Sequence, residues 1–230
     1  MSAPRFPDAV LAEYDWRHVR DDTETALSLP LFTITAYNTI YEHAPSSDAF
    51  AAVGDPEVDV SGRSAFTSAL EFSTPLMEFG FSPASVFGIA CDHAKTEFAD
   101  SVREDGLVNV TRFADRDIDR VDRRGDPRGT GSDPARAFGY DVEYPLVDDV
   151  IAEDVTSGQF TVRGELWAII WPTDRAYAMA GGMFPTENVA DAIARQAPAA
   201  TLATDTDLDV DVERDRERLL DALKRAETVD

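Results

Sequence analysis

Cysteine, aspartate and histidine are adjacent at Cys91, Asp92 and His93, and these three side-chain types together could support nucleophilic catalysis. The apolar spacing around them predicts a helix, in which successive residues are about 100° apart. Cys91 then lies on the apolar stripe and His93 about 200° round the helix, so their side chains do not face each other. We therefore interpret Cys91 as a small core residue and predict no catalytic residues.

Acidic side chains suggest metal sites in three places, but none has the required spacing. His93 and Glu97 stand four residues apart on one predicted helix face, and two ligands are too few for a protein metal site. The aspartate-rich runs that begin at Asp115 and Asp205 lack the glycine and the glutamate that a calcium loop needs at its sixth and twelfth positions. The sequence therefore predicts neither a metal nor a cofactor.

Segment 115–136 differs from the rest of the chain because its six arginines balance its six aspartates. Its glycine-rich part, 125–132, lacks the Gly-Lys-Ser/Thr ending of a phosphate-binding loop. We expect a long loop between strands, which either contacts an acidic partner or has no binding role. Its candidate binding residues are Arg120, Arg123, Arg124 and Arg128.

Large aromatic residues with polar groups form a second candidate binding set. Trp167 and Trp171 are four residues apart on one face of a predicted strand that also carries Arg163, and Tyr37 and Tyr41 have the same spacing on another strand. Such residues can line a ligand pocket. They can equally cover the second face of a sheet beneath a helix, and both interpretations stay open.

The charge composition is extreme, with 29 Asp, 15 Glu and only two Lys, and a net charge of −23. At molar salt the screening length falls to roughly 3 Å, so the self-repulsion of such a chain largely disappears. We interpret the acidity as that of a halophilic, cytoplasmic protein; a protein that binds basic ligands is the alternative. The charge makes nucleic acid an unexpected partner, and no apolar stretch is long enough to cross a membrane.

Hydrophobic periodicity predicts an α+β fold with a largely antiparallel sheet of about six strands, one long and one short helix packed on it, and a C-terminal helix. The long helix is expected to begin at Ser82-Pro83, since an N-cap residue precedes a proline there. Residues 45–62 are expected to be a surface connection. A hairpin is expected across residues 172–174. The strands are expected near residues 16–29, 31–41, 65–72, 107–113, 138–146, 160–171 and 175–184.

We predict that the chain divides into a single α+β domain over residues 8–196, an acidic linker over 197–211 and a charged helix over 212–227. The linker is expected because the aromatic-rich alternation gives way to alanine, proline and aspartate. The final helix has only Leu219, Leu220 and Leu223 as its apolar stripe, so it is expected to dock weakly or not at all.

Several short motifs resemble a family of uncharacterised halophilic archaeal proteins. They are Thr-Ile-Thr-Ala-Tyr-Asn-Thr-Ile-Tyr-Glu-His at 33–43, Phe-Ser-Thr-Pro at 72–75, Phe-Ser-Pro-Ala at 81–84 and Phe-Pro at 184–185. The resemblance covers roughly residues 14–196. Many members of that family carry a lipoprotein signal, which this sequence does not show, so no envelope role is expected. The element order is also similar to the α/β/α sandwich of the photosystem oxygen-evolving extrinsic subunits, which implies binding or assembly.

Two functions of different classes follow from these observations. The first is a non-enzymatic binding or assembly module with another protein as its partner, acting through its sheet face or through the segment 115–136. The alternative is an enzyme that acts on a small organic substrate in a pocket lined by the aromatic set.

Overall fold

Seven strands form one antiparallel sheet in the computed structural model, which describes residues 4–28, 30, 32–56, 58, 62–121, 134–147, 159–198 and 206–227. Their order across the sheet is β1-β2-β3-β7-β6-β5-β4. The strands are β1 (Trp16–Ser28), β2 (Thr33–His43), β3 (Ser64–Phe72), β4 (Val108–Asp117), β5 (Arg136–Pro145), β6 (Thr161–Pro172) and β7 (Tyr177–Pro185).

The predicted fold class, α+β with a largely antiparallel sheet, is confirmed, with seven described strands in place of about six. The hairpin between β6 and β7 forms as expected, with Pro172 opposite Tyr177. The central pair, β3 and β7, joins segments that are far apart in the sequence, with Ser64 opposite Met183. The third strand and the last strand of the chain are therefore neighbours in the middle of the sheet.

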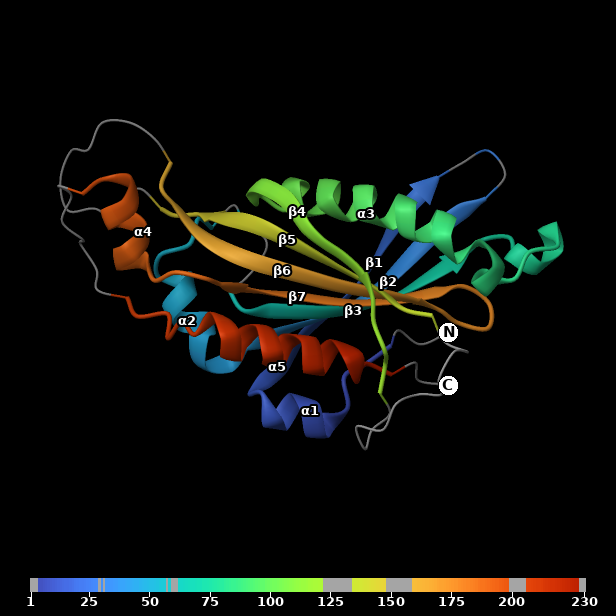
Figure 1. Cartoon of the computed structure of the whole chain (residues 1–230), viewed down its shortest axis with the longest axis horizontal. Helices are drawn as coiled ribbons and strands as arrows, with labels where there is room; N and C mark the ends of the chain where they lie inside the picture. Colours follow the sequence, from blue (N-terminus) through green and yellow to red (C-terminus); the bar gives the residue numbers. More distant parts are fainter. Residues whose placement is uncertain are drawn as a thin grey trace.

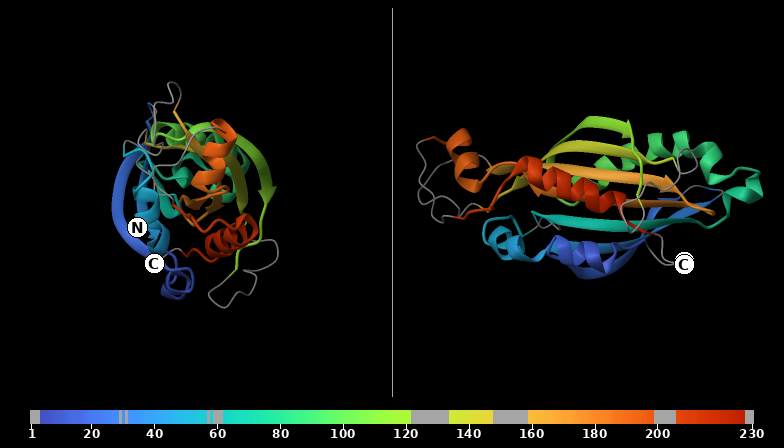
Figure 2. Two further views of the ribbon diagram at one scale, coloured as in Figure 1. Left: turned by 90° about the vertical axis from the view of Figure 1, so that its left-hand side faces the viewer. Right: turned by 60° about the horizontal axis from the view of Figure 1, so that its bottom comes forward.

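Helices cover both faces of this sheet (Figure 1). The helices are α1 (Asp8–Glu13), α2 (Ala44–Ala51), α3 (Phe87–Glu104), α4 (Val189–Gln196) and α5 (Val212–Lys224), with two 3-10 turns, η1 (Leu76–Phe79) and η2 (Pro83–Val86). Helix α3 lies over one face, and α1 and α5 lie over the other, as the rotated views in Figure 2 also show. The molecule thus has three layers and two hydrophobic cores.

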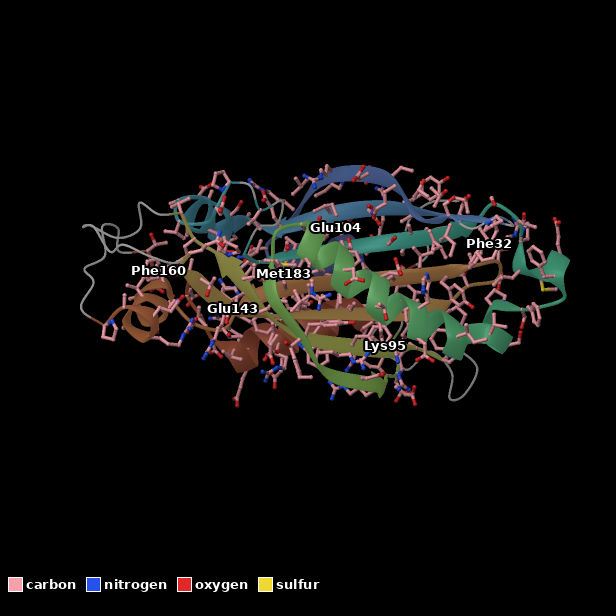
Figure 3. All side chains as sticks on the ribbon, turned by 90° about the horizontal axis from the view of Figure 1, so that it is seen from above. Phe32, Lys95, Glu104, Glu143, Phe160 and Met183 are labelled. Carbon is pink, nitrogen blue, oxygen red and sulfur yellow. The ribbon has the colours of Figure 1, made fainter. Side chains whose placement is uncertain are left out.

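Helix α3 lies across one face of the sheet (Figure 3). It packs on that face with the apolar stripe that the sequence predicts. Cys91 and Val102 are buried, and Phe98 packs against Phe66 and Tyr140. The helix begins later than expected. Ser82 caps the 3-10 turn η2, its Oγ accepting a hydrogen bond from the Ser85 amide at 3.2 Å, and the α-helical bonds start at Phe87.

Residues 45–62, expected to be a surface connection, contain part of a helix in the described structure. Helix α2 buries Phe50, whose ring lies 5.1 Å from that of Tyr144 in an edge-on arrangement. Gly62 permits this contact, since a Cβ there would lie 1.9 Å from the Phe50 ring. The composition of the segment concealed the helix because its single large aromatic residue gives no helical periodicity.

The expected weak docking of the C-terminal helix is wrong. Helix α5 packs across β6 and β7, and Leu219, Ala222 and Leu223 are buried in the second core. Glycine makes the close approach possible, because a Cβ at Gly182 of β7 would lie 2.7 Å from Leu219 Cδ1. A narrow apolar stripe is therefore sufficient to dock α5, because the glycine of β7 lets the leucine side chain contact the backbone of the strand directly.

Candidate functional site

Large apolar side chains are exposed at one end of the molecule, on a surface that we call the apolar tip (residues 75–89). Met77, Phe79, Phe81 and Ile89 are 64%, 43%, 50% and 74% exposed. They belong to η1, the connection after it and the first turn of α3. In Figures 1 and 2 this teal segment projects at the opposite end of the long axis from α4.

Local hydrogen bonds fix the backbone of the apolar tip. Gly80 ends η1 in the left-handed conformation at φ 81°, which glycine adopts without steric cost. The Phe81 amide then donates to the Leu76 carbonyl at 3.1 Å. The Ser82 cap follows directly and starts η2. The exposed rings are therefore carried by a backbone with defined turns.

A buried tyrosine connects the apolar tip to the centre of the sheet. Tyr177, at the start of β7, donates its hydroxyl to the Pro83 carbonyl at 2.9 Å. Its ring stacks on Phe87 with the centroids 6.2 Å apart. Burial raises the pKa of Tyr177 to about 12, so the hydroxyl remains a donor at neutral pH. The tip is thus held against the rigid part of the fold.

The charge of the tip is as unusual as its exposure. Residues 73–91 contain a single charged side chain, Glu78, in a chain that is 28% charged. Depletion of charge with enrichment of aromatic residues and methionine is typical of the buried centre of protein interfaces. The sequence-based prediction missed these residues, and the local loss of charge was the signal that could have found them.

The aromatic candidates do not form one pocket. Tyr37 and Tyr41 lie on β2, which β3 and β7 separate from Trp167 and Trp171 on β6. Tyr41 and both tryptophans are buried in the second core, beneath α1 and α5. Of the two interpretations, the placement of these three residues fits the one in which they cover a sheet face beneath helices.

Each of the two tryptophans has a cation above its ring. Arg116 lies 5.2 Å from the Trp167 ring centroid, and the Trp167 Nε1–H donates to Glu165 at 3.1 Å. Arg120 lies 3.8 Å from the Trp171 ring and donates from Nη2 to the Ala226 carbonyl. Arg120 therefore connects the residues that follow α5 to Trp171 of β6.

Of the other arginine candidates, the structure describes Arg163. Arg163 is exposed on β6, where its backbone N–H donates to Glu187 at 2.9 Å. Arg123, Arg124 and Arg128 lie outside the described residues.

Cys91 and His93, two residues apart on α3, lie in different environments. Cys91 is buried, and burial raises the pKa of its thiol to about 11. His93 is exposed, and its Nδ1 lies 3.8 Å from Glu97. Across the described ranges, no group of three or more His, Cys, Asp or Glu side chains is placed to hold a metal ion.

The helices of the described ranges are all too short or too polar to cross a membrane. No curated protein and no solved structure matches the chain significantly. One family model, described as a domain of unknown function (DUF6517), matches residues 3–227. This match includes α5 as well as the sheet, and the chain therefore belongs to the DUF6517 family.

Proposed function

We propose that this protein is a non-enzymatic binding module and that the apolar tip is the surface with which it binds a protein partner. The observation that carries the proposal is the exposure of Met77, Phe79, Phe81 and Ile89 on one ordered projection. Several large apolar side chains exposed on one segment commonly mark an interaction site, because leaving them in water is unfavourable.

The shape and charge of the tip indicate the chemistry of the partner. Two aromatic rings, a methionine and an isoleucine on a projection fit an apolar groove better than a flat polar surface. Only Glu78 brings a charge into the contact. Binding through apolar groups is not screened by salt, unlike binding through ion pairs, which suits a chain of net charge −23.

The alternative, an enzyme with an aromatic pocket, receives less support. Its candidate residues divide between β2 and β6, and Trp167, Trp171 and Tyr41 are largely inaccessible to a substrate. A substrate would have to displace α1 or α5 to reach them.

Affinity capture from a native lysate at molar KCl, with parallel identification of proteins and metabolites, tests the proposal. The bait is the full chain, and the test variant is the double substitution Phe79→Ser with Phe81→Ser. The matched control is Phe113→Ser, since Phe113 on β4 is 45% exposed and Phe79 is 43% exposed. We expect one stoichiometric protein, retained by the control and lost with the tip variant.

Two results would contradict the proposal. One is a partner that the tip variant retains. The other is a small molecule that co-purifies with all three baits in the absence of any protein, which would favour the enzyme. Purified wild type and variants are compared by thermal unfolding first, so that loss of the partner is not confused with loss of the fold.

A further inference from the structure

A small pocket of ≈ 60 Å³ opens where α5 meets the ends of β1, β2 and β7. Its apolar wall is formed by Trp16, Phe184 and Leu219. A cavity that holds one water molecule has a volume of about 10–15 Å³ when it is measured in the same way, so this pocket has room for a ligand group of several non-hydrogen atoms. It lies on the α5 side of the sheet, away from the apolar tip.

Three arginines line the pocket, and two of them are neutralised there. Arg63 Nη2 donates to Asp215 Oδ2 at 2.7 Å, and Arg214 Nε donates to Asp215 Oδ1 at 3.0 Å. Arg214 also lies 3.3 Å from the carboxylate of Asp209. Two carboxylates thus face two guanidinium groups, and this part of the pocket has no net charge.

The third arginine, Arg218, adds one positive charge. It is exposed and forms no hydrogen bond or ion pair with any residue of the described structure. His43 does not add a second charge at neutral pH, since burial and the nearby Arg63 lower its pKa. Among the described residues that line the pocket, Arg218 is therefore a guanidinium without a carboxylate partner, beside an apolar wall.

We propose that this pocket binds a carboxylate with a short apolar body, with Arg218 as its charged anchor. The planar guanidinium matches a carboxylate in a two-pronged geometry. Asp209 and Asp215 are already paired with Arg63 and Arg214, so within the described structure Arg218 offers one unpaired positive charge, which suits a monoanion better than a dianion such as a phosphate monoester. The apolar body rests on Trp16 and Leu219.

This chemistry has two sources, a free monocarboxylic acid and the C-terminus of a peptide. Both are tested with the full chain at constant ionic strength, by following backbone and indole signals in two-dimensional NMR. The probes are propionate against propionamide, and an acetylated Gly-Gly-Ala peptide with a free against an amidated C-terminus. We expect saturable shifts at Trp16 and at the first turns of α5 with the carboxylates and none with the amides.

The decisive variant is Arg218→Gln, which should weaken carboxylate binding by roughly tenfold or more, because it removes a charge-assisted pair. Arg175→Gln is the matched control, since Arg175 is exposed and lies in the turn at the opposite end of β7. Its affinity should equal that of the wild type. Tighter binding of propionate assigns a free acid, and tighter binding of the peptide assigns a chain terminus.

Three outcomes would overturn the proposal: no saturable shift with any carboxylate, equal binding of acids and amides, or equal binding by Arg218→Gln and wild type. Arg218 is exposed, so its substitution should leave the thermal midpoint unchanged. None of these results depends on the apolar tip, so the two proposals stand or fall separately.

Discussion

Arg63, which directly precedes β3, donates a hydrogen bond to Asp215 of α5 at 2.7 Å across 152 residues of sequence, and the two side chains are 8% and 7% exposed. The pair joins the C-terminal helix to the middle of the sheet. Removing one partner of a buried ion pair destabilises the folded protein strongly, because the remaining charge is buried without a counter-charge or water around it.

Asp215→Asn should therefore lower the free energy of unfolding by about 3–5 kcal/mol. The double substitution Arg63→Met with Asp215→Leu should recover much of this loss, because it replaces both buried charges with apolar side chains. Denaturant unfolding at fixed salt measures both. Equal stability of Asp215→Asn and wild type would show that the pair does not hold α5.

Gly182→Ala should destabilise the protein through the docking of α5. The added Cβ would lie 2.6 Å from the Ser64 carbonyl oxygen and 2.7 Å from Leu219 Cδ1, so the helix or the strand must shift. Overpacking of this kind costs about 1–3 kcal/mol. Gly88→Ala is the matched control, because nothing lies within 4 Å of a Cβ at that position. A control as unstable as Gly182→Ala would contradict the assignment of the loss to the helix contact.

Substitutions on α3 should rank by the face on which each residue lies. Phe98→Ala should cost about 3–5 kcal/mol, since the ring contacts Phe66 and Tyr140 at centroid distances of 5.6 and 5.9 Å. His93→Ala, at an exposed position, should change stability by no more than about 0.5 kcal/mol. Thermal unfolding gives the ranking. A loss at His93 equal to that at Phe98 would mean that His93 has a buried or functional role.

The thiol of Cys91 should resist alkylation in the folded protein. Its pKa is raised to about 11 by burial, whereas an unfolded cysteine titrates near about 8.5. The folded state favours the protonated thiol, so this contribution to stability is complete below about pH 8.5 and is lost as the pH rises toward 11. Iodoacetamide labelling at pH 8 should proceed only in denaturant. In Cys91→Ser, the free energy of unfolding should fall less steeply between about pH 8.5 and 11 than in the wild type, because the thiol no longer titrates. Rapid labelling of the folded chain would contradict the buried position.

The midpoint of thermal unfolding should rise steeply as KCl increases to molar concentration. A net charge of −23 opposes compaction, and salt shortens the range of that repulsion from about 10 Å at 0.1 M to about 3 Å at 1 M. Calorimetry across a KCl series measures the effect. A midpoint independent of salt would instead indicate that the acidic surface has a specific basic ligand.

Local periodicity in the sequence determined the secondary structure well. Alternation over residues 138–146 and the stripe from Phe87 to Val102 predicted β5 and the buried face of α3, because each reports which side of one element is apolar. The same signal was weak for α2, since Phe50 is the single large apolar side chain that this short helix buries, and one residue gives no period to detect.

The tertiary structure decided which elements are neighbours. The pairing of β3 with β7 separates the tyrosines of β2 from the tryptophans of β6, and no local pattern carries that strand order. The docking of α5 depends on the glycine beneath Leu219 and on Arg63 facing Asp215, which are complementary only after the chain has folded. Exposure was decided in the same way. Phe66 and Phe79 are the same residue type, but α3 packs against Phe66, and nearly half of Phe79 is open to solvent, because burial depends on the surface that a side chain meets.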